Sequence, residues 1–237
     1  VKALEIDIKE ACTLHCSDIG HPIDKFDVTY ENIQARERTQ VLMDYACKEG
    51  GFVVGTGDLS ELALGWCTYN ADHISMYGVN CGVPKTLVRW MISALIDYNV
   101  FPDSTEVLKD IIDTPISPEL LPPDENGNIQ QETEEIIGPY ALHDFFLYYL
   151  LRFGFSPSKI FFLASEAFRE DFDKETILKW LQVFYKRFFT QQFKRSCLPD
   201  GVKIGSVCLS PRGDWRMPSD ASYKLWLDEI KAIPNKL

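Results

Sequence analysis

The sequence predicts an α/β protein whose C-terminal half is almost entirely helical. Two observations lead to this prediction. Over about the first 100 residues, short apolar runs alternate with a helical pattern, as expected for the strands and helices of a parallel sheet. From about residue 138 to the end, apolar residues recur at helical spacing, and glycine or proline separates the segments.

The first elements predict a β-α-β unit. Residues 3–8 (ALEIDI) form a short apolar run and are expected to be a strand. Helical spacing follows over residues 30–48 and stops at the Gly50–Gly51 pair. Residues 52–55 (FVVG) are continuously apolar, as in a buried parallel strand. Strand, helix and strand in this order predict a right-handed crossover.

Two further helices and a loop are expected in the middle of the chain. Asp58 and Glu61 are spaced as in a capping box and predict a short helix over residues 58–64. Pro84 suits the first turn of a helix that reaches about residue 98. Residues 122–135 are polar, acidic and without apolar periodicity, so we expect a mobile loop that closes over bound substrate.

The C-terminal half carries three helical patterns, over residues 140–153, 157–168 and 174–195. Gly154 is a natural stop for the first of them. Residues 202–216 have no period and are expected to form a loop, and Ser219 is a good N-cap for a last helix. Aromatic residues at helical spacing in this half indicate a core or a subunit interface, and we expect a homo-oligomer.

Composition excludes several classes of protein. The formal net charge of -11 argues against nucleic acid as a partner, because phosphate neutralisation needs an excess of Lys and Arg. No apolar run is long enough to span a bilayer, so we expect no membrane partner. Seven cysteines are scattered without the spacing of a zinc site or a disulfide framework. They indicate free thiols in a reducing compartment, and we expect a cytoplasmic protein.

The segment that follows the predicted strand 52–55 is the first candidate site. Ligands of open α/β sheets bind outside the carboxyl ends of the strands. Gly55 and Gly57 allow close approach to the backbone there, and Thr56 offers a hydroxyl. Glu61 has two possible roles, which are to close the capping box with Asp58 or to bind Mg²⁺ beside phosphate oxygens. Spacing alone favours the cap.

Basic residues provide the second and third indications of a ligand site. Lys85 is predicted at a helix N-terminus, where the helix dipole disfavours a cation unless an anion binds or the long stem carries the charge into solvent. Residues 186–216 contain seven basic side chains and two acidic ones in an otherwise acidic chain. That segment favours a small polyanionic ligand, although Lys194 and Arg195 could also complement a helix C-terminus.

Three stretches resemble a known family. They are residues 55–89 (GTGDLSELALGWCTYNADHISMYGVNCGVPKTLVR), residues 138–160 (GPYALHDFFLYYLLRFGFSPSKI), and the strings QQFKRSCLPDG and LSPRGDWRMPSD within residues 191–220. All are similar to the synthetase domain of glutamine-dependent NAD⁺ synthetases of the long form, in which a glutaminase domain precedes the synthetase domain. The resemblance covers nearly the whole chain. It implies a parallel-sheet ATP-pyrophosphatase fold of the adenine nucleotide alpha hydrolase-like type.

The resemblance implies a two-step ligase. ATP adenylates the nicotinate carboxylate of deamido-NAD⁺, and ammonia derived from glutamine then gives NAD⁺ and AMP. Mg²⁺ is the implied metal, with Glu61 as the matching ligand, which reverses the preference for a cap alone. Positions that match ATP contacts are Thr56, Lys85 and Ser117. Positions that match deamido-NAD⁺ contacts are Asn32, Arg36, Glu61, Trp66, Cys67, Thr68, Tyr69 and Lys194.

The family's phosphate-binding string, SGGxDS, is absent from residues 1–237, and so is the glutaminase domain. The chain is therefore expected to be a fragment, truncated at the N-terminus of its fold, with an α/β part over about residues 1–100 and a helical part over about residues 138–237. Two alternatives remain. One is another amide-forming ATP-pyrophosphatase, and the other is a fragment that binds a dinucleotide without turnover.

Overall fold

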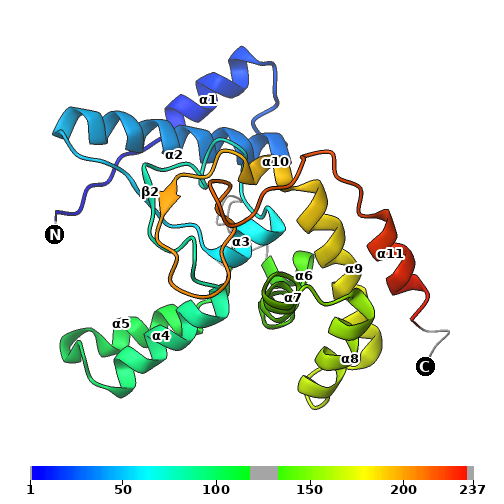
Figure 1. Cartoon of the computed structure of the whole chain (residues 1–237). Coiled ribbons are helices and arrows are strands. Elements are labelled where there is room, and N and C mark those ends of the chain that lie inside the picture. The colour runs from blue at the N-terminus through cyan, green and yellow to red at the C-terminus, as the bar shows by residue number, and fades with distance from the viewer. Residues whose placement is uncertain (1, 118–132, 234–237) are drawn as a thin grey trace.

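The computed structural model describes residues 2–117 and 133–233. Its N-terminal half contains a small set of helices around short strands (Figure 1). In chain order these elements are α1 (Lys9–Asp18), α2 (Val28–Glu49), β1 (Val54–Gly55), α3 (Leu59–Leu64), β2 (Tyr77–Gly78), α4 (Lys85–Asp97), the 3₁₀ helix η1 (Pro102–Ser104) and α5 (Thr105–Asp113).

The C-terminal half is helical apart from one strand. Its elements are α6 (Thr133–Ile137), α7 (Tyr140–Phe153), α8 (Pro157–Ala167), α9 (Lys174–Thr190), α10 (Gln192–Arg195), β3 (Asp200–Gly201) and α11 (Lys224–Lys231). The predicted stops are confirmed, because Gly50 and Gly154 both cap their helices in the left-handed conformation. The predicted α/β class with a helical C-terminal half is also confirmed.

The described strands form one parallel sheet in the order β1-β2-β3. Val54 pairs with Tyr77 and Tyr77 with Asp200, so the strand from the helical half completes the sheet. Gly201 permits this close pairing. A Cβ atom at Gly201 would lie 2.3 Å from Cys81 Sγ and 2.4 Å from the backbone oxygen of Gly78.

The strand predicted over residues 3–8 is wrong, and the predicted crossover from it is therefore absent. Residues 2–8 are irregular, and Leu4 and Ile6 are each about half exposed. A strand needs a neighbouring strand as its hydrogen-bonding partner. Among the described strands, β1 pairs only with β2, and residues 2–8 pair with none of them. Phe52 and Val54 at this open edge are correspondingly exposed.

Other boundaries also differ from the prediction. Residues 174–195 form two helices, α9 and α10, because the chain leaves helical geometry at Gln191. The last helix begins at Lys224 with Tyr223 as its N-cap, so Ser219 is not a cap. Most of the loop predicted at residues 122–135 lies outside the described residues, but its end begins α6 with a buried Thr133.

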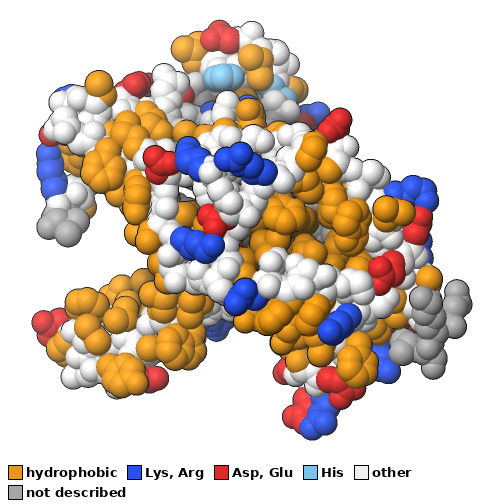
Figure 2. All heavy atoms as spheres, viewed as in Figure 1, with side chains coloured by type: hydrophobic (Ala, Val, Ile, Leu, Met, Phe, Trp, Pro, Cys, Tyr) orange, Lys and Arg blue, Asp and Glu red, His pale blue; other side chains and the backbone are white. Residues whose placement is uncertain are grey.

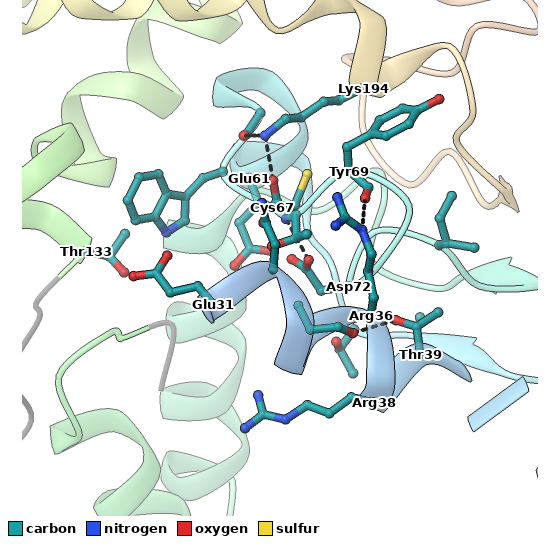
Figure 3. Close-up of a pocket in the computed structure, with 18 of the residues that line it drawn as sticks. Glu31, Arg36, Arg38, Thr39, Glu61, Cys67, Tyr69, Asp72, Thr133 and Lys194 are labelled. Carbon is teal, nitrogen blue, oxygen red and sulfur yellow. Dashed lines mark hydrogen bonds between the residues drawn. The ribbon is translucent and has the colours of Figure 1, made fainter. Parts of the chain in front are cut away.

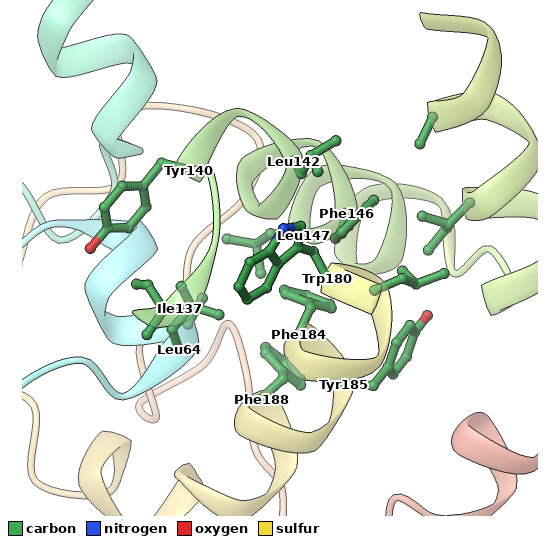
Figure 4. Close-up of a cluster of buried hydrophobic side chains, with 14 of the residues drawn as sticks. Leu64, Ile137, Tyr140, Leu142, Phe146, Leu147, Trp180, Phe184, Tyr185 and Phe188 are labelled. Atoms are coloured by element: carbon green, nitrogen blue, oxygen red, sulfur yellow. The ribbon is translucent and has the colours of Figure 1, made fainter. Parts of the chain in front are cut away.

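Helix α9 supplies more of the buried core residues than any other element, and α7 packs against it (Figure 4). Phe146 and Leu147 of α7 pack with Phe184 and Phe188 of α9, and all four side chains are at most 2% exposed. Helix α3 from the N-terminal half joins the same cluster through its leucines. The core therefore holds the two halves together and fixes where α3 lies.

One histidine is enclosed by this aromatic core. His143 Nε2 lies 2.7 Å from the backbone oxygen of Ile137, so this nitrogen donates, and the rings of Phe146, Trp180 and Phe184 surround it. Burial lowers the pKa of His143 to about 4. The unfolded chain therefore binds this proton more readily, and the folded state loses stability as pH falls below about 6.5.

We predict that the His143→Gln variant lacks this acid-sensitive contribution. Between pH 7 and pH 4 the wild-type chain should lose about 3 kcal/mol more unfolding free energy than the variant, from the shift between the two pKa values. Urea denaturation at a series of pH values measures the difference. The exposed His15 provides the matched control, and a parallel pH profile for wild type and His143→Gln would contradict the prediction.

Candidate functional site

The site is organised around α3, which follows β1 directly. Asp58 is the N-cap, and its side chain accepts the Glu61 N–H at 3.0 Å. The Glu61 side chain in turn accepts the Asp58 N–H at 3.3 Å, so the predicted capping box is confirmed. Gly65 ends the helix in the left-handed conformation. Apart from Glu61, every side chain of α3 is buried.

Lys85 completes the N-terminal end of α3. Its Nζ lies 2.8 Å from Asp58 Oδ2 and 2.6 Å from Glu61 Oε1, so two carboxylates rather than a bound anion offset its charge. Burial and the neighbouring Asp58 raise the pKa of Glu61, while Lys85 opposes the rise. Two carboxylates around one ammonium group give the cluster an excess of negative charge, which favours the binding of a further cation there.

Asp144 of α7 ties α3 to α4, and the sequence did not reveal it. Its carboxylate accepts hydrogen bonds from the Ser60 hydroxyl, the Thr86 N–H at 3.1 Å and the Thr86 hydroxyl at 2.7 Å. The Ser60 hydroxyl also accepts the Lys85 N–H at 2.8 Å. This network holds Lys85 and Glu61 at a fixed place beside the end of β1.

Three cations satisfy the carbonyl groups at the other end of α3. Arg187 donates to Leu64 O at 2.9 Å, and Arg195 donates to Leu62 O and Ala63 O. Lys194 Nζ donates to Gly65 O at 2.8 Å and Cys67 O at 2.5 Å. Burial lowers the pKa of Arg195 to about 9. The sequence pattern thus correctly suggested a helix C-terminus for Lys194 and Arg195, but the helix is α3 and not their own.

A pocket of about 700 Å³ lies between α2, the end of β1, the turn after α3 and the start of α10 (Figure 3). All the residues that the sequence suggested for ATP or deamido-NAD⁺ line it. They are Asn32, Arg36, Thr56, Glu61, Trp66, Cys67, Thr68, Tyr69, Lys85, Ser117 and Lys194. The structure therefore brings these positions together from several segments of the chain.

The pocket is basic although the chain is acidic. Its charged lining comprises Arg36, Arg38, Lys85, Arg187 and Lys194 against Glu31, Glu61 and Asp72. Arg36 Nε donates to Tyr69 O at 3.4 Å, and the Arg187 guanidinium lies 5.2 Å from the centre of the Trp66 ring. Such a surface suits an anionic ligand that carries aromatic rings.

Several lining residues were missed by the sequence analysis, namely Glu31, Arg38, Asp72 and Thr133, whereas Arg187 belongs to the predicted basic segment. Helical periodicity placed α2 but could not say which of its faces meets the strand end. Part of the predicted basic segment, conversely, lies outside the pocket. Lys203 pairs with Asp214 at 2.6 Å and Arg212 with Asp200 at 2.8 Å, so these side chains stabilise the exposed loop itself.

We predict that Asp144→Ala destabilises the chain by about 1–3 kcal/mol, because the hydroxyls of Ser60 and Thr86 and one backbone N–H lose their acceptor. The free energy of unfolding in urea measures the loss. Asp171→Ala, at an exposed position, is the matched control. An equally small effect of both substitutions would show that the network does not hold α3 against α4.

Comparisons with known proteins agree on one family. The family model described as NAD synthase matches residues 1–162. A glutamine-dependent NAD(+) synthetase of Mycobacterium leprae is 47% identical over 251 residues, which cover 96% of this chain and 37% of the relative. That of Thermotoga maritima is 31% identical and covers 84% of this chain and 30% of the relative. The chain thus spans about a third of the length of these curated relatives.

Solved structures show the same fold. A glutamine-dependent NAD(+) synthetase from Cytophaga hutchinsonii superposes with a TM-score of 0.69 at 18% identity, over 94% of this chain and 34% of that one. The NMN synthetase from Francisella tularensis gives a TM-score of 0.52 at 18% identity, over 81% of this chain and 64% of that one. At these identities the likeness supports the ATP-pyrophosphatase type of fold and nothing about ligands.

Proposed function

The chain belongs to the NAD synthase family, and from this membership we propose that it is the substrate-binding portion of a longer glutamine-dependent NAD⁺ synthetase. One observation carries the proposal. The residues that match ligand positions of the family are spread over residues 32–194 of the sequence, yet all of them line one basic pocket. A pocket of about 700 Å³ is large enough for nucleotide-sized ligands.

The substrates we propose are ATP, deamido-NAD⁺ and ammonia released from glutamine. Thr56, Lys85 and Ser117 would bind ATP at the end of β1. On the α2 and α10 walls of the pocket, the deamido-NAD⁺ contacts would come from Asn32, Arg36, Glu61, Trp66, Cys67, Thr68, Tyr69 and Lys194. Lys194 has three donors and uses two on Gly65 O and Cys67 O, which leaves one for an anion in the pocket.

The proposed reaction has two steps. A nicotinate carboxylate oxygen of deamido-NAD⁺ attacks the α-phosphorus of ATP, and the bond to the β-phosphate breaks as pyrophosphate leaves. Ammonia then attacks the carboxyl carbon of the adenylate, and AMP leaves with the former carboxylate oxygen while ammonia loses a proton. The described residues position both substrates and balance their charge, and none of them is proposed as a proton carrier.

Glu61 fits the Mg²⁺ that the family implies. Its two oxygens accept the Asp58 N–H and face the Lys85 ammonium, in a cluster with more negative than positive charge. Mg²⁺ prefers one or two carboxylates together with phosphate oxygens and water, so a single glutamate beside the nucleotide is sufficient. When bound, the ion would offset the negative charge of the leaving pyrophosphate.

The longer protein would supply what this chain lacks. We propose that a glutaminase domain and the phosphate-binding loop belong to the same polypeptide, and that the enzyme works in the cytoplasm. Among the residues that the structure describes, no helix has the length and apolar character to cross a bilayer.

A homo-oligomer remains our expectation. The arm formed by α4 and α5 stands away from the body and has no buried residue, while Trp90, Tyr98 and Val107 on it are each more than half exposed (Figure 2). A second copy of the chain would cover this apolar surface.

We predict that the full-length protein converts deamido-NAD⁺, ATP and glutamine into NAD⁺, AMP and pyrophosphate, whereas residues 1–237 alone show no turnover even with ammonia. The reason is that SGGxDS, whose backbone N–H groups would hold pyrophosphate, is absent from these residues. Quantification of NAD⁺ and AMP by chromatography tests both proteins. Turnover by the short chain would mean that the ATP site has been misplaced, and dinucleotide binding by the full-length protein without turnover would favour a purely binding role.

We predict that Glu61→Gln in the full-length enzyme lowers kcat by about 10²–10³ and changes deamido-NAD⁺ affinity much less. The substitution keeps the size of the side chain and removes the charge that Mg²⁺ needs. Titration of Mg²⁺ against rate measures the effect, with the exposed Glu106→Gln as the control. Normal rates at every Mg²⁺ concentration would show that Glu61 serves only as the cap of α3.

A further inference from the structure

Among the residues that the structure describes, two polar side chains on the pocket wall lack a hydrogen-bond partner, and neither is among the positions that the family resemblance assigns to a ligand. Glu31 lies in the first turn of α2 and lines the pocket. Its backbone N–H donates to Asp27 O, but within residues 2–117 and 133–233 its carboxylate makes no hydrogen bond or ion pair, and the nearby Asp27 is also acidic. Thr133, at the start of α6, is 1% exposed, and its hydroxyl has no partner in the same ranges.

A backbone hydrogen bond fixes Thr133 beside the segment that follows α5. Its N–H donates to the backbone oxygen of Ile116 at 2.9 Å, so α6 begins against the residues that follow α5. A buried hydroxyl without a hydrogen bond costs about 1–3 kcal/mol. Such groups are rare and commonly mark a site that a ligand or water completes.

Glu31 is equally unusual. A glutamate in the first turn of a helix is stabilised by the helix dipole, which explains an exposed residue at this place. Here the carboxyl group is partly buried, and burial followed by the charge of Asp27 raises its pKa. Figure 3 shows that Glu31 and Thr133 extend toward one another from opposite walls of the pocket. The two side chains therefore frame one corner.

The chemistry of this corner limits what can bind there. Phosphate is excluded because a carboxylate repels it, and the basic residues Arg36 and Lys194 offer it a better place. A ribose has two neighbouring hydroxyls, and a carboxylate can accept a hydrogen bond from each of them. An adenine amino group would donate only one or two protons and would bring a ring nitrogen, itself an acceptor, close to the carboxylate.

We propose that Glu31 and Thr133 form a hydroxyl-recognition subsite that binds the 2′,3′-diol of a ribose of the nucleotide substrate. The Glu31 carboxylate accepts a hydrogen bond from each of the two hydroxyls, and the Thr133 hydroxyl donates a hydrogen bond to one of the same hydroxyl oxygens. The apolar walls that Trp66 and Ile116 contribute to the pocket suit the sugar ring. The proposal rests on the proposed function in so far as the pocket takes nucleotides, and the ribose could belong to ATP or to deamido-NAD⁺.

Calorimetric titration of the full-length protein tests this subsite. ATP, 2′-deoxy-ATP, 3′-deoxy-ATP, deamido-NAD⁺ and its 2′- and 3′-deoxyribose analogues are titrated into wild type, Glu31→Gln and Thr133→Val. We expect Glu31→Gln to lower the binding affinity for one of the two ribonucleotides by about 10- to 100-fold, as for the loss of a hydrogen bond to a charged group. Thr133→Val should weaken the same ligand by about 2- to 10-fold. The variants thus identify which substrate supplies the ribose.

The deoxy analogues give the decisive comparison. Wild type should bind the deoxy form of that nucleotide more weakly, and Glu31→Gln should discriminate much less between the ribo and deoxy forms, because the amide keeps only one acceptor oxygen and carries no charge. Glu37→Gln is the matched control, since Glu37 lies on the same helix but beside Cys12 of α1.

Three results would overturn the proposal. In the first, Glu31→Gln binds both nucleotides with unchanged affinity. In the second, Glu31→Gln loses the same affinity for the ribo form and for the deoxy form. In the third, Glu31→Gln changes only how the reaction rate depends on ammonia concentration. The proposed function fails separately. If the hydroxyl dependence is found but no NAD⁺ forms, the subsite stands and the reaction is wrong. If NAD⁺ forms and Glu31→Gln binds normally, only the subsite is wrong.

Discussion

The short helix α3 must satisfy its backbone groups inside the protein, and much of the structure follows from this requirement. A helix leaves four N–H groups and four C=O groups unpaired at its ends, and α3 is only six residues long. Its N-terminal groups are met by the capping box of Asp58 and Glu61. Its C-terminal carbonyl groups are met by Arg187, Lys194 and Arg195, which come from helices more than 120 residues later in the chain.

These same polar groups make the pocket. Glu61 and Lys85 face it at one end of α3, and Lys194 and Arg187 face it at the other. Each of them therefore has a structural partner as well as a place on the wall. A side chain held in this way loses little further freedom when a ligand binds, which is the advantage of a preorganised site. Arg195 has the purely structural role, since it is 1% exposed and donates to four oxygen atoms.

The charge of the pocket is opposite to the charge of the chain as a whole. This contrast does not come from the basic loop alone, because Lys203 and Arg212 pair with nearby acids there. It arises because α2, α9 and α10 each turn basic side chains toward the end of β1. An acidic exterior with a basic pocket favours small polyanions over nucleic acid, in agreement with the family to which the chain belongs.

The sequence by itself determined those features that depend on near neighbours. Asp58 and Glu61 are three residues apart, Gly50 and Gly154 end their helices, and the apolar stripe of α9 repeats at helical spacing, so each could be predicted. The long motifs also indicated the family and the positions that line the pocket. Tertiary structure alone decided the features that need distant partners. Residues 3–8 stay irregular because none of the described strands pairs with them, and two-residue strands such as β2 and β3 exist only through their pairing. The contacts of Asp144 and the burial of Thr133 could not be predicted for the same reason, since they depend on where the chain folds back, and no local pattern records that.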